Sequence, residues 1–173
     1  MIFLETPRAA LQDTRGQGRG RYRRHATDPD VRRYVGGQAW PLEKAQHRFR
    51  NQFLGQPTET YGLWAAIFKE EQRYIGCCGL RHVEGGKSAH LRYYFARPYW
   101  RRGFATEAAK GFVEVAFGRL ALLTIVADVG KGNQASGHIL QRLRFEYVSR
   151  EEIPVSGRVI LSYELSRGEW ESS

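Results

Sequence analysis

The sequence predicts a single α/β domain over residues 1–173, with a mixed, mostly antiparallel sheet of six to seven strands and helices on both faces. Three observations support this fold class. A chain of 173 residues is long enough to bury one substantial core. Three strand-like runs follow one another in its middle, as in an antiparallel meander. A helical segment then separates them from a dense β-branched run, which requires a crossover connection.

Alternating or β-branched runs define the strands, and Pro7 places an edge or a bend in the first of them. The expected strands are residues 2–11, 62–67, 73–80, 90–96, 122–128, 145–148 and 159–165. Because the crossover helix must pack over residues 122–128, we expect that strand to be buried on both faces.

Apolar residues at helical spacing define helices over residues 41–54, 103–118 and 133–143. Residues 15–25 interrupt this pattern with five arginines and three glycines. Because each glycine costs a helix about 1 kcal/mol relative to alanine, we expect a solvated loop there. The alternative is an arm that contacts RNA phosphates.

Composition restricts partners and location. The formal net charge of +9 favours anionic partners, which include coenzyme phosphates, acidic substrates and nucleic acid. Residues 1–4 are too short for a signal sequence and no apolar run reaches membrane-spanning length, so we expect a cytoplasmic protein without membrane contact. Cys77 and Cys78 are strand neighbours that point to opposite faces, which disfavours a bridge between them.

The turn from the strand at 90–96 into the helix at 103–118 is the strongest candidate site. Gly103 lets backbone approach a ligand closely, and the first N–H groups of the helix point into the same space. Arg101 and Arg102 add positive charge, and Thr106 adds a hydroxyl. This pattern favours a pyrophosphate, although a glycine turn by itself is weak evidence.

The run YWRRGFATEA at residues 99–108, followed by NQAS at 133–136 and LRF at 143–145, resembles the acetyl-CoA-binding core of the GNAT superfamily of N-acetyltransferases. Within it, the chain resembles the ribosomal-protein N-terminal acetyltransferases and their small-molecule relatives. The resemblance extends to residues 5–8, 28–36 and 167–170.

The resemblance implies where the coenzyme binds. Its pyrophosphate is expected at Arg101, Arg102, Gly103, Phe104, Ala105 and Thr106. The pantetheine arm is expected along Tyr94, Phe95 and Ala96, where a backbone N–H receives the oxyanion. Asn133 is expected to hydrogen-bond the pantetheine, and the Ser136 hydroxyl to protonate the leaving thiolate. The alternative is that Asn133 only caps its helix.

His90 is the candidate base, because it stands where many relatives carry a glutamate. A surface histidine at a strand start is the alternative. Other candidates are the carboxylates of Glu152 and Glu164 and, as acids, the hydroxyls of Tyr93 and Tyr147.

Two arginines depart from the family pattern. Arg101 replaces the glycine usual after the tryptophan, and Arg144 the glycine usual before the phenylalanine. If these positions need a positive φ, an arginine strains the backbone by about 1–3 kcal/mol.

The resemblance implies direct transfer of an acetyl group from acetyl-CoA to a primary amine, without a covalent enzyme intermediate and without a metal. We expect the acceptor to be a protein or peptide α-amino group, with a small amine as the alternative. A rival from another class is a weakly catalytic module that binds RNA through residues 15–25. The sequence leaves open whether the chain is a monomer or a homodimer.

Overall fold

The computed structural model describes residues 2–13, 29–33, 41, 43–44, 47, 61–83, 86–154 and 156–172. The expected loop at 15–25 lies outside these residues, as does most of the expected helix at 41–54. Eight strands form one sheet in the order β1-β2-β3-β4-β5-β6-β8-β7. Only the β5–β6 pair is parallel. The predicted fold class is confirmed, with eight strands in place of six to seven.

The chain begins with a hairpin, not with the single strand expected over residues 2–11. β1 (Ile2–Glu5) and β2 (Ala9–Gln12) pair antiparallel. Pro7 lies in the turn between them, where its fixed φ and missing N–H do no harm. The turn closes through Thr6, whose N–H donates to the carbonyl of Ala9. The hairpin adds two strands to the edge of the sheet, because β2 pairs with β3.

The antiparallel meander is confirmed. It consists of β3 (Gly62–Phe68), β4 (Arg73–His82) and β5 (Ser88–Phe95). A 3₁₀ turn (η2, Arg97–Tyr99) follows β5 and precedes helix α4 (Phe104–Glu114). A π-helical turn (η3, Val115–Arg119) continues the helix at its C-terminal end.

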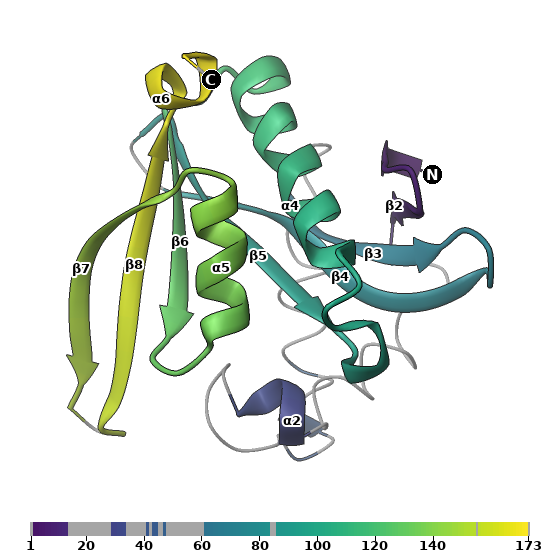
Figure 1. Cartoon of the computed structure of the whole chain (residues 1–173), viewed down its shortest axis with the longest axis horizontal. Helices are drawn as coiled ribbons and strands as arrows, with labels where there is room; N and C mark the ends of the chain where they lie inside the picture. Colours follow the sequence, from purple (N-terminus) through teal and green to yellow (C-terminus); the bar gives the residue numbers. More distant parts are fainter. Residues whose placement is uncertain are drawn as a thin grey trace.

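The crossover helix α4 leads into β6 (Thr124–Gly130), which pairs with β5 only from His90 back to Ser88. Beyond His90 the two strands separate, as Figure 1 shows. Helix α5 (Gln134–Arg142) follows β6, so its first turn lies beside the separation (Figure 1). A short helix, α2 (Pro29–Arg32), lies near the same end of the molecule in Figure 1.

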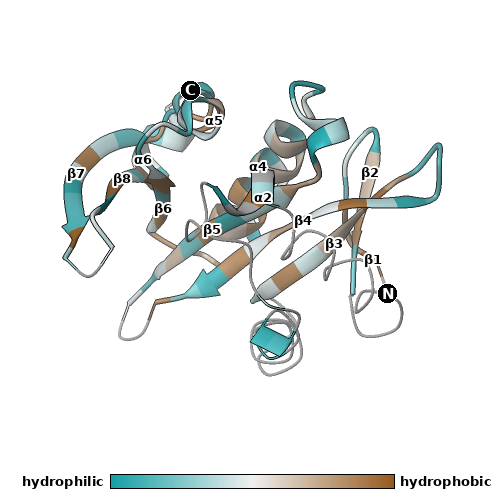
Figure 2. Ribbon diagram, turned by 90° about the horizontal axis from the view of Figure 1, so that it is seen from below, coloured by the Kyte–Doolittle hydropathy of each residue, from teal (hydrophilic) through white to brown (hydrophobic). Residues whose placement is uncertain are grey.

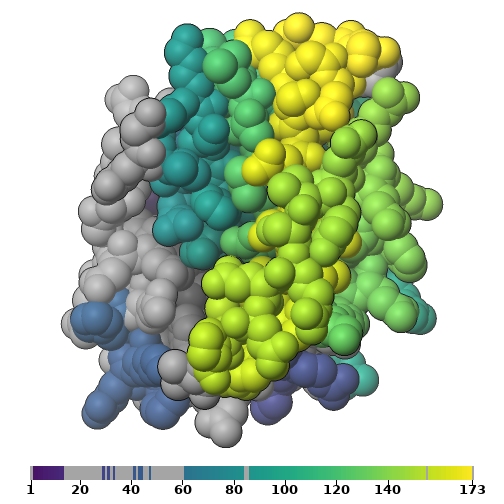
Figure 3. All heavy atoms as spheres, turned by 90° about the vertical axis from the view of Figure 1, so that its left-hand side faces the viewer, coloured from purple at the N-terminus to yellow at the C-terminus, as the bar shows by residue number. Residues whose placement is uncertain are grey.

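The final hairpin joins β7 (Glu146–Ile153) to β8 (Arg158–Ser166), and β8 pairs with β6. Figure 3 shows this C-terminal segment in lime and yellow along one side of the molecule. β7 is the edge strand, and seven of its eight residues are exposed. A capping box between Ser166 and Glu169 starts the last helix, α6 (Arg167–Glu171).

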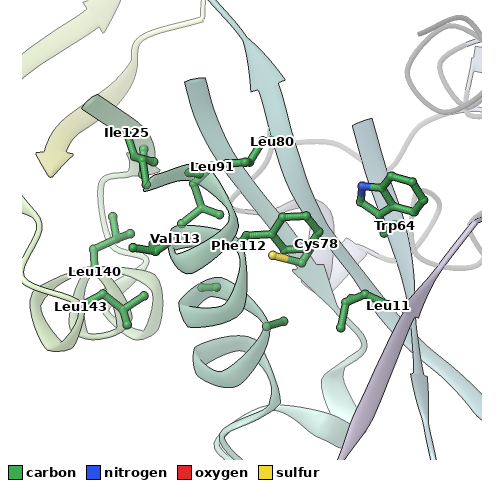
Figure 4. Packing of buried hydrophobic residues seen from close by; sticks show 14 of the residues in the cluster. Leu11, Trp64, Cys78, Leu80, Leu91, Phe112, Val113, Ile125, Leu140 and Leu143 are labelled. Carbon is green, nitrogen blue, oxygen red and sulfur yellow. The ribbon is translucent and has the colours of Figure 1, made fainter. Parts of the chain in front are cut away.

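The core lies between the sheet and helices α4 and α5, which are on the same side of the strands in Figure 2. Phe112 and Val113 of α4 are fully buried. In Figure 4 Phe112 lies next to Cys78 of β4, whereas Val113 lies towards Leu140 of α5. This packing fixes α4 against β4 on one side and α5 on the other.

The expectation that the strand at 122–128 is buried on both faces is wrong. Along β6, Ile125, Ala127 and Val129 are buried, whereas Asp128 is exposed. The helices cover the odd-numbered side chains, and the even-numbered ones point to the opposite face. That opposite face holds part of the candidate site.

Candidate active site

The start of α4 is a left-handed turn with free backbone donors. Gly103 is the N-cap, with φ 83° and ψ −7°, and Arg101 also has a positive φ of 58°. Among the described residues no side chain caps the helix, so none of them occupies its first N–H groups. Together with the positive end of the helix dipole, such a turn forms a binding site for an anion.

The turn between β1 and β2 packs on this helix start. Arg8 donates through Nε to Oε1 of Glu107 at 2.7 Å, and its Nη2 lies 2.5 Å from the same oxygen. Thr6 donates to the other carboxylate oxygen at 3.2 Å. A Cβ added at Gly103 would lie 2.8 Å from Nη2 of Arg8. Arg8 therefore neutralises Glu107 beside the anion site and fills the space behind the glycine.

The side chains of Arg101 and Arg102 point in different directions, and only that of Arg101 lines the cavity described below. The Arg102 guanidinium lies over the rings of Phe68, Tyr99 and Phe104, 5.3–5.7 Å from their centroids. It therefore forms cation–π contacts on the far side of the turn. Arg101, in contrast, is exposed and lines that cavity.

The start of α5 faces the same space. Asn133 accepts a hydrogen bond through Oδ1 from the Ser136 N–H at 3.2 Å, which is an N-cap contact. The Ser136 hydroxyl lies 2.7 Å from that of Tyr93 on β5. Asn133 therefore caps α5 through its side-chain oxygen, and no described residue accepts a hydrogen bond from its amide NH₂ group.

A cavity of about 930 Å³ joins these features. Its walls come from Val31 of α2, the end of β5, the turn before α4, the first turn of α4 and the whole length of α5. Of the predicted coenzyme residues, Tyr94, Phe95, Arg101, Gly103, Ala105, Thr106, Asn133 and Ser136 line it. Ala96, Arg102 and Phe104 do not, and Phe104 is buried in the core. Any role for these three in the cavity has to come from the backbone.

Backbone hydrogen bonds restrict which N–H can serve as an oxyanion donor. The Ala96 N–H donates to the carbonyl of Ile75 at 2.9 Å, so it points towards β4. Because successive residues of a strand alternate, the Phe95 N–H points to the open edge beyond which β6 has separated. The Trp100 indole donates to the Phe95 carbonyl at 2.6 Å and holds that edge in place.

His90 does not line the cavity. It is the last residue of β5 that pairs with β6, and its side chain lies on the face of the sheet opposite the helices. Its Nδ1 is 3.6 Å from Oδ2 of Asp128, and the other carboxylate oxygen, Oδ1, accepts a hydrogen bond from the Ser162 hydroxyl at 2.9 Å. Burial lowers the pKa of His90, Asp128 opposes this, and Arg81 and Arg92 add to the lowering. Neutral histidine is the form that accepts a proton.

Of the other candidates, Tyr93 lines the cavity, whereas Glu152, Glu164 and Tyr147 lie outside it. Glu152 pairs with Arg150 at 3.6 Å, and Tyr147 is 56% exposed on the edge strand. Burial raises the pKa of Cys77 to about 12 and that of Cys78 well above its usual range, so both thiols stay protonated. In the part of the chain that the structure describes, no cluster of His, Cys, Asp or Glu could hold a metal ion.

Sequence reasoning missed one wall of the cavity. His138, Ile139 and Arg142 of α5 line it together with Ala135. These residues recur three and four positions apart, which places them on one helix face. Their spacing was visible in the sequence, but it identified only the apolar stripe.

Among the described helices, none is long and apolar enough to cross a membrane.

Comparison with known proteins gives the family. Residues 17–146 match the model of the acetyltransferase (GNAT) domain. The chain is 32% identical over 129 residues to the uncharacterized protein YkkB of Bacillus subtilis (strain 168), covering 69% of this chain and 70% of that protein.

Two solved structures share the fold. A GNAT-family acetyltransferase from Bacillus anthracis superposes with a TM-score of 0.84 at 18% identity, covering 98% of this chain and 100% of the other. RimL, a ribosomal L7/L12 alpha-N-protein acetyltransferase in complex with coenzyme A, superposes with a TM-score of 0.81 at 11% identity, covering 98% and 99%. Because the family model spans most of the sequence, the chain belongs to the GNAT family of acetyltransferases.

Proposed function

We propose that this acetyltransferase moves the acetyl group of acetyl-CoA directly to the α-amino group of a protein or peptide. One observation carries the proposal: the uncapped start of α4, the start of α5 and the open edge of β5 border one cavity. The ribosomal L7/L12 acetyltransferase that shares the fold motivates the choice of a protein N-terminus as acceptor. A small amine is the alternative acceptor.

The residues present fit the coenzyme. Diphosphate oxygens match the N–H groups after Gly103, with Arg101 supplying the exposed positive charge. A thin, mostly polar pantetheine chain matches the open edge of β5 and the Asn133 amide. The Phe95 N–H would then donate a hydrogen bond to the thioester oxygen and stabilise the negative charge that develops there.

Proton transfers at the two ends of the reaction fall to different residues. His90 takes a proton from the amine, directly or through water, and Asp128 holds its imidazole. Because His90 lies outside the cavity, the acceptor would reach it from the face opposite the helices. Ser136 gives a proton to the departing sulfur from the cavity side.

The proposal is tested by thiol release from acetyl-CoA over a panel of peptides with free N-termini and of small amines. Turnover with peptides that is lost when their N-termini are blocked supports the proposal. Turnover with small amines alone assigns the alternative acceptor. If a chain lacking residues 15–25 keeps its turnover, RNA binding is not the main activity, whereas salt-sensitive RNA binding without turnover contradicts the proposal.

The coenzyme site is tested separately by Gly103→Glu, with Gly157→Glu as the matched control. Both glycines have a positive φ, 83° and 62°, so both substitutions strain the backbone. Gly157 lies in the β7–β8 turn with nothing within 4 Å of an added Cβ. We expect calorimetry to show loss of coenzyme binding for Gly103→Glu only. Equal affinity in the two variants would remove the anion site from the proposal.

A further inference from the structure

The hydroxyl groups of Tyr93 and Ser136 meet inside the cavity, and the chemistry described so far uses only the serine. Tyr93 lies on β5 and Ser136 in the first turn of α5, so their contact bridges the opening between β5 and β6. The 2.7 Å between the oxygens is the usual length of an O–H···O hydrogen bond. Both residues line the cavity.

Either hydroxyl can donate in this bond, and we assign the donor role to the tyrosine. A phenol, with an ordinary pKa of about 10, is a stronger donor than an aliphatic hydroxyl. The alternative acceptor for Tyr93 is the Ser136 carbonyl, which is farther away at 3.4 Å. When Tyr93 donates to Oγ, the serine proton is free to turn towards the cavity.

The phenol keeps its proton at neutral pH. Burial raises the pKa of Tyr93, and the hydrogen bond with Ser136 only partly opposes this. A tyrosine in this state is a poor acid but a lasting hydrogen-bond donor. The serine is fixed from its other side as well, because its N–H donates to Asn133.

We propose that Tyr93 is a positioning residue for the acetyl transfer: it directs the Ser136 proton into the cavity and stabilises the serine oxygen while that proton is away. The inference rests on the proposed function. As the C–N bond forms, the C–S bond breaks and its electron pair stays on sulfur. The proton of Ser136 Oγ goes to that sulfur, and water returns one to the serine. The surplus proton of the amine leaves through His90 to water, and Tyr93 keeps its own.

Tyr93→Phe removes the hydroxyl and leaves the ring. A hydrogen bond to an oxygen that becomes charged is strong, so kcat should fall roughly 10- to 100-fold. The KM for acetyl-CoA should stay within about twofold, because the bond acts in the transition state and not in binding. Tyr147→Phe, which removes an exposed phenol outside the cavity, is the control.

A double-mutant cycle separates positioning from packing. In a Ser136→Ala background the tyrosine has no serine to act on, so Tyr93→Phe should change kcat by less than about twofold. Equal losses in both backgrounds would mean that Tyr93 matters only for packing and would overturn the inference. An unchanged kcat in the parent background would overturn it too.

A binding measurement tests the same contact without an acceptor. If the Tyr93–Ser136 pair donates to sulfur, coenzyme A should gain affinity over its desulfo analogue as pH rises through the thiol pKa. Tyr93→Phe should reduce that gain several-fold. A gain that is the same in both proteins, or absent from the parent, overturns the inference and leaves the proposed function standing. Failure of the parent to bind coenzyme A at all overturns both.

Discussion

Replacing Arg144 by glycine should stabilise the protein. Arg144 follows α5 with φ 65°, and the chain closes there in a Schellman motif. Its two bonds run from the Phe145 N–H to Leu140 at 2.9 Å and from the Arg144 N–H to Gln141 at 3.0 Å. A residue with a Cβ in the left-handed region lowers the free energy of unfolding by about 1–2 kcal/mol. Glycine lowers it by about 0.5–1 kcal/mol, because the unfolded chain gains conformational entropy. The difference favours glycine by about 0.5–1 kcal/mol.

Thermal unfolding measures this directly. For a chain of this size 1 kcal/mol corresponds to about 2–4 °C, so Arg144→Gly should raise Tm by about 1–4 °C. Arg144→Ala is the matched control, because it removes the charge but keeps the Cβ. If alanine raises Tm as much as glycine does, charge repulsion and not backbone strain explains the gain. A lower Tm for the glycine variant would refute the strain argument itself.

Two further outcomes concern titration. The rate should rise with pH as His90 loses its proton. Asp128 raises the pKa of His90, so the midpoint of the pH–rate profile should move to lower pH in Asp128→Asn. Arg92 lowers that pKa, so the midpoint should move to higher pH in Arg92→Gln. Identical profiles in the two variants would clear His90 of the role of base. Cys77→Ala and Cys78→Ala should keep kcat within about twofold, and alkylation of the native thiols should require unfolding, since burial keeps both protonated.

The sequence predicted the meander, the crossover helix and the turn that opens this helix, because their signals are local. Gly103 is a turn residue followed directly by apolar residues at helical spacing, and the structure shows that its backbone is left-handed. The substitutions at Arg101 and Arg144 were equally informative. Both residues do have a positive φ, so the family pattern identified the backbone conformation correctly even where the glycine is missing.

Contacts between distant segments were beyond sequence reasoning. Arg8 and Glu107 are 99 residues apart, and only the folded hairpin brings them together beside Gly103. Arg102 was assigned to the phosphate by its charge, but the aromatic rings of Phe68 and Tyr99 hold its guanidinium elsewhere. Charge in a sequence does not specify direction, because a long side chain reaches several partners from one Cα.

The separation of β5 from β6 accounts for the whole arrangement of the site. Pairing between β5 and β6 stops at His90. The same strand β5 therefore carries His90 at its last position paired with β6 and the Phe95 N–H on the edge that β6 no longer covers. Side-chain alternation sends His90 and Tyr93 to opposite faces of the sheet. Under the proposed function, His90 as base on one face and Ser136, in contact with Tyr93, as proton donor on the other would act on a thioester held in the opening between them.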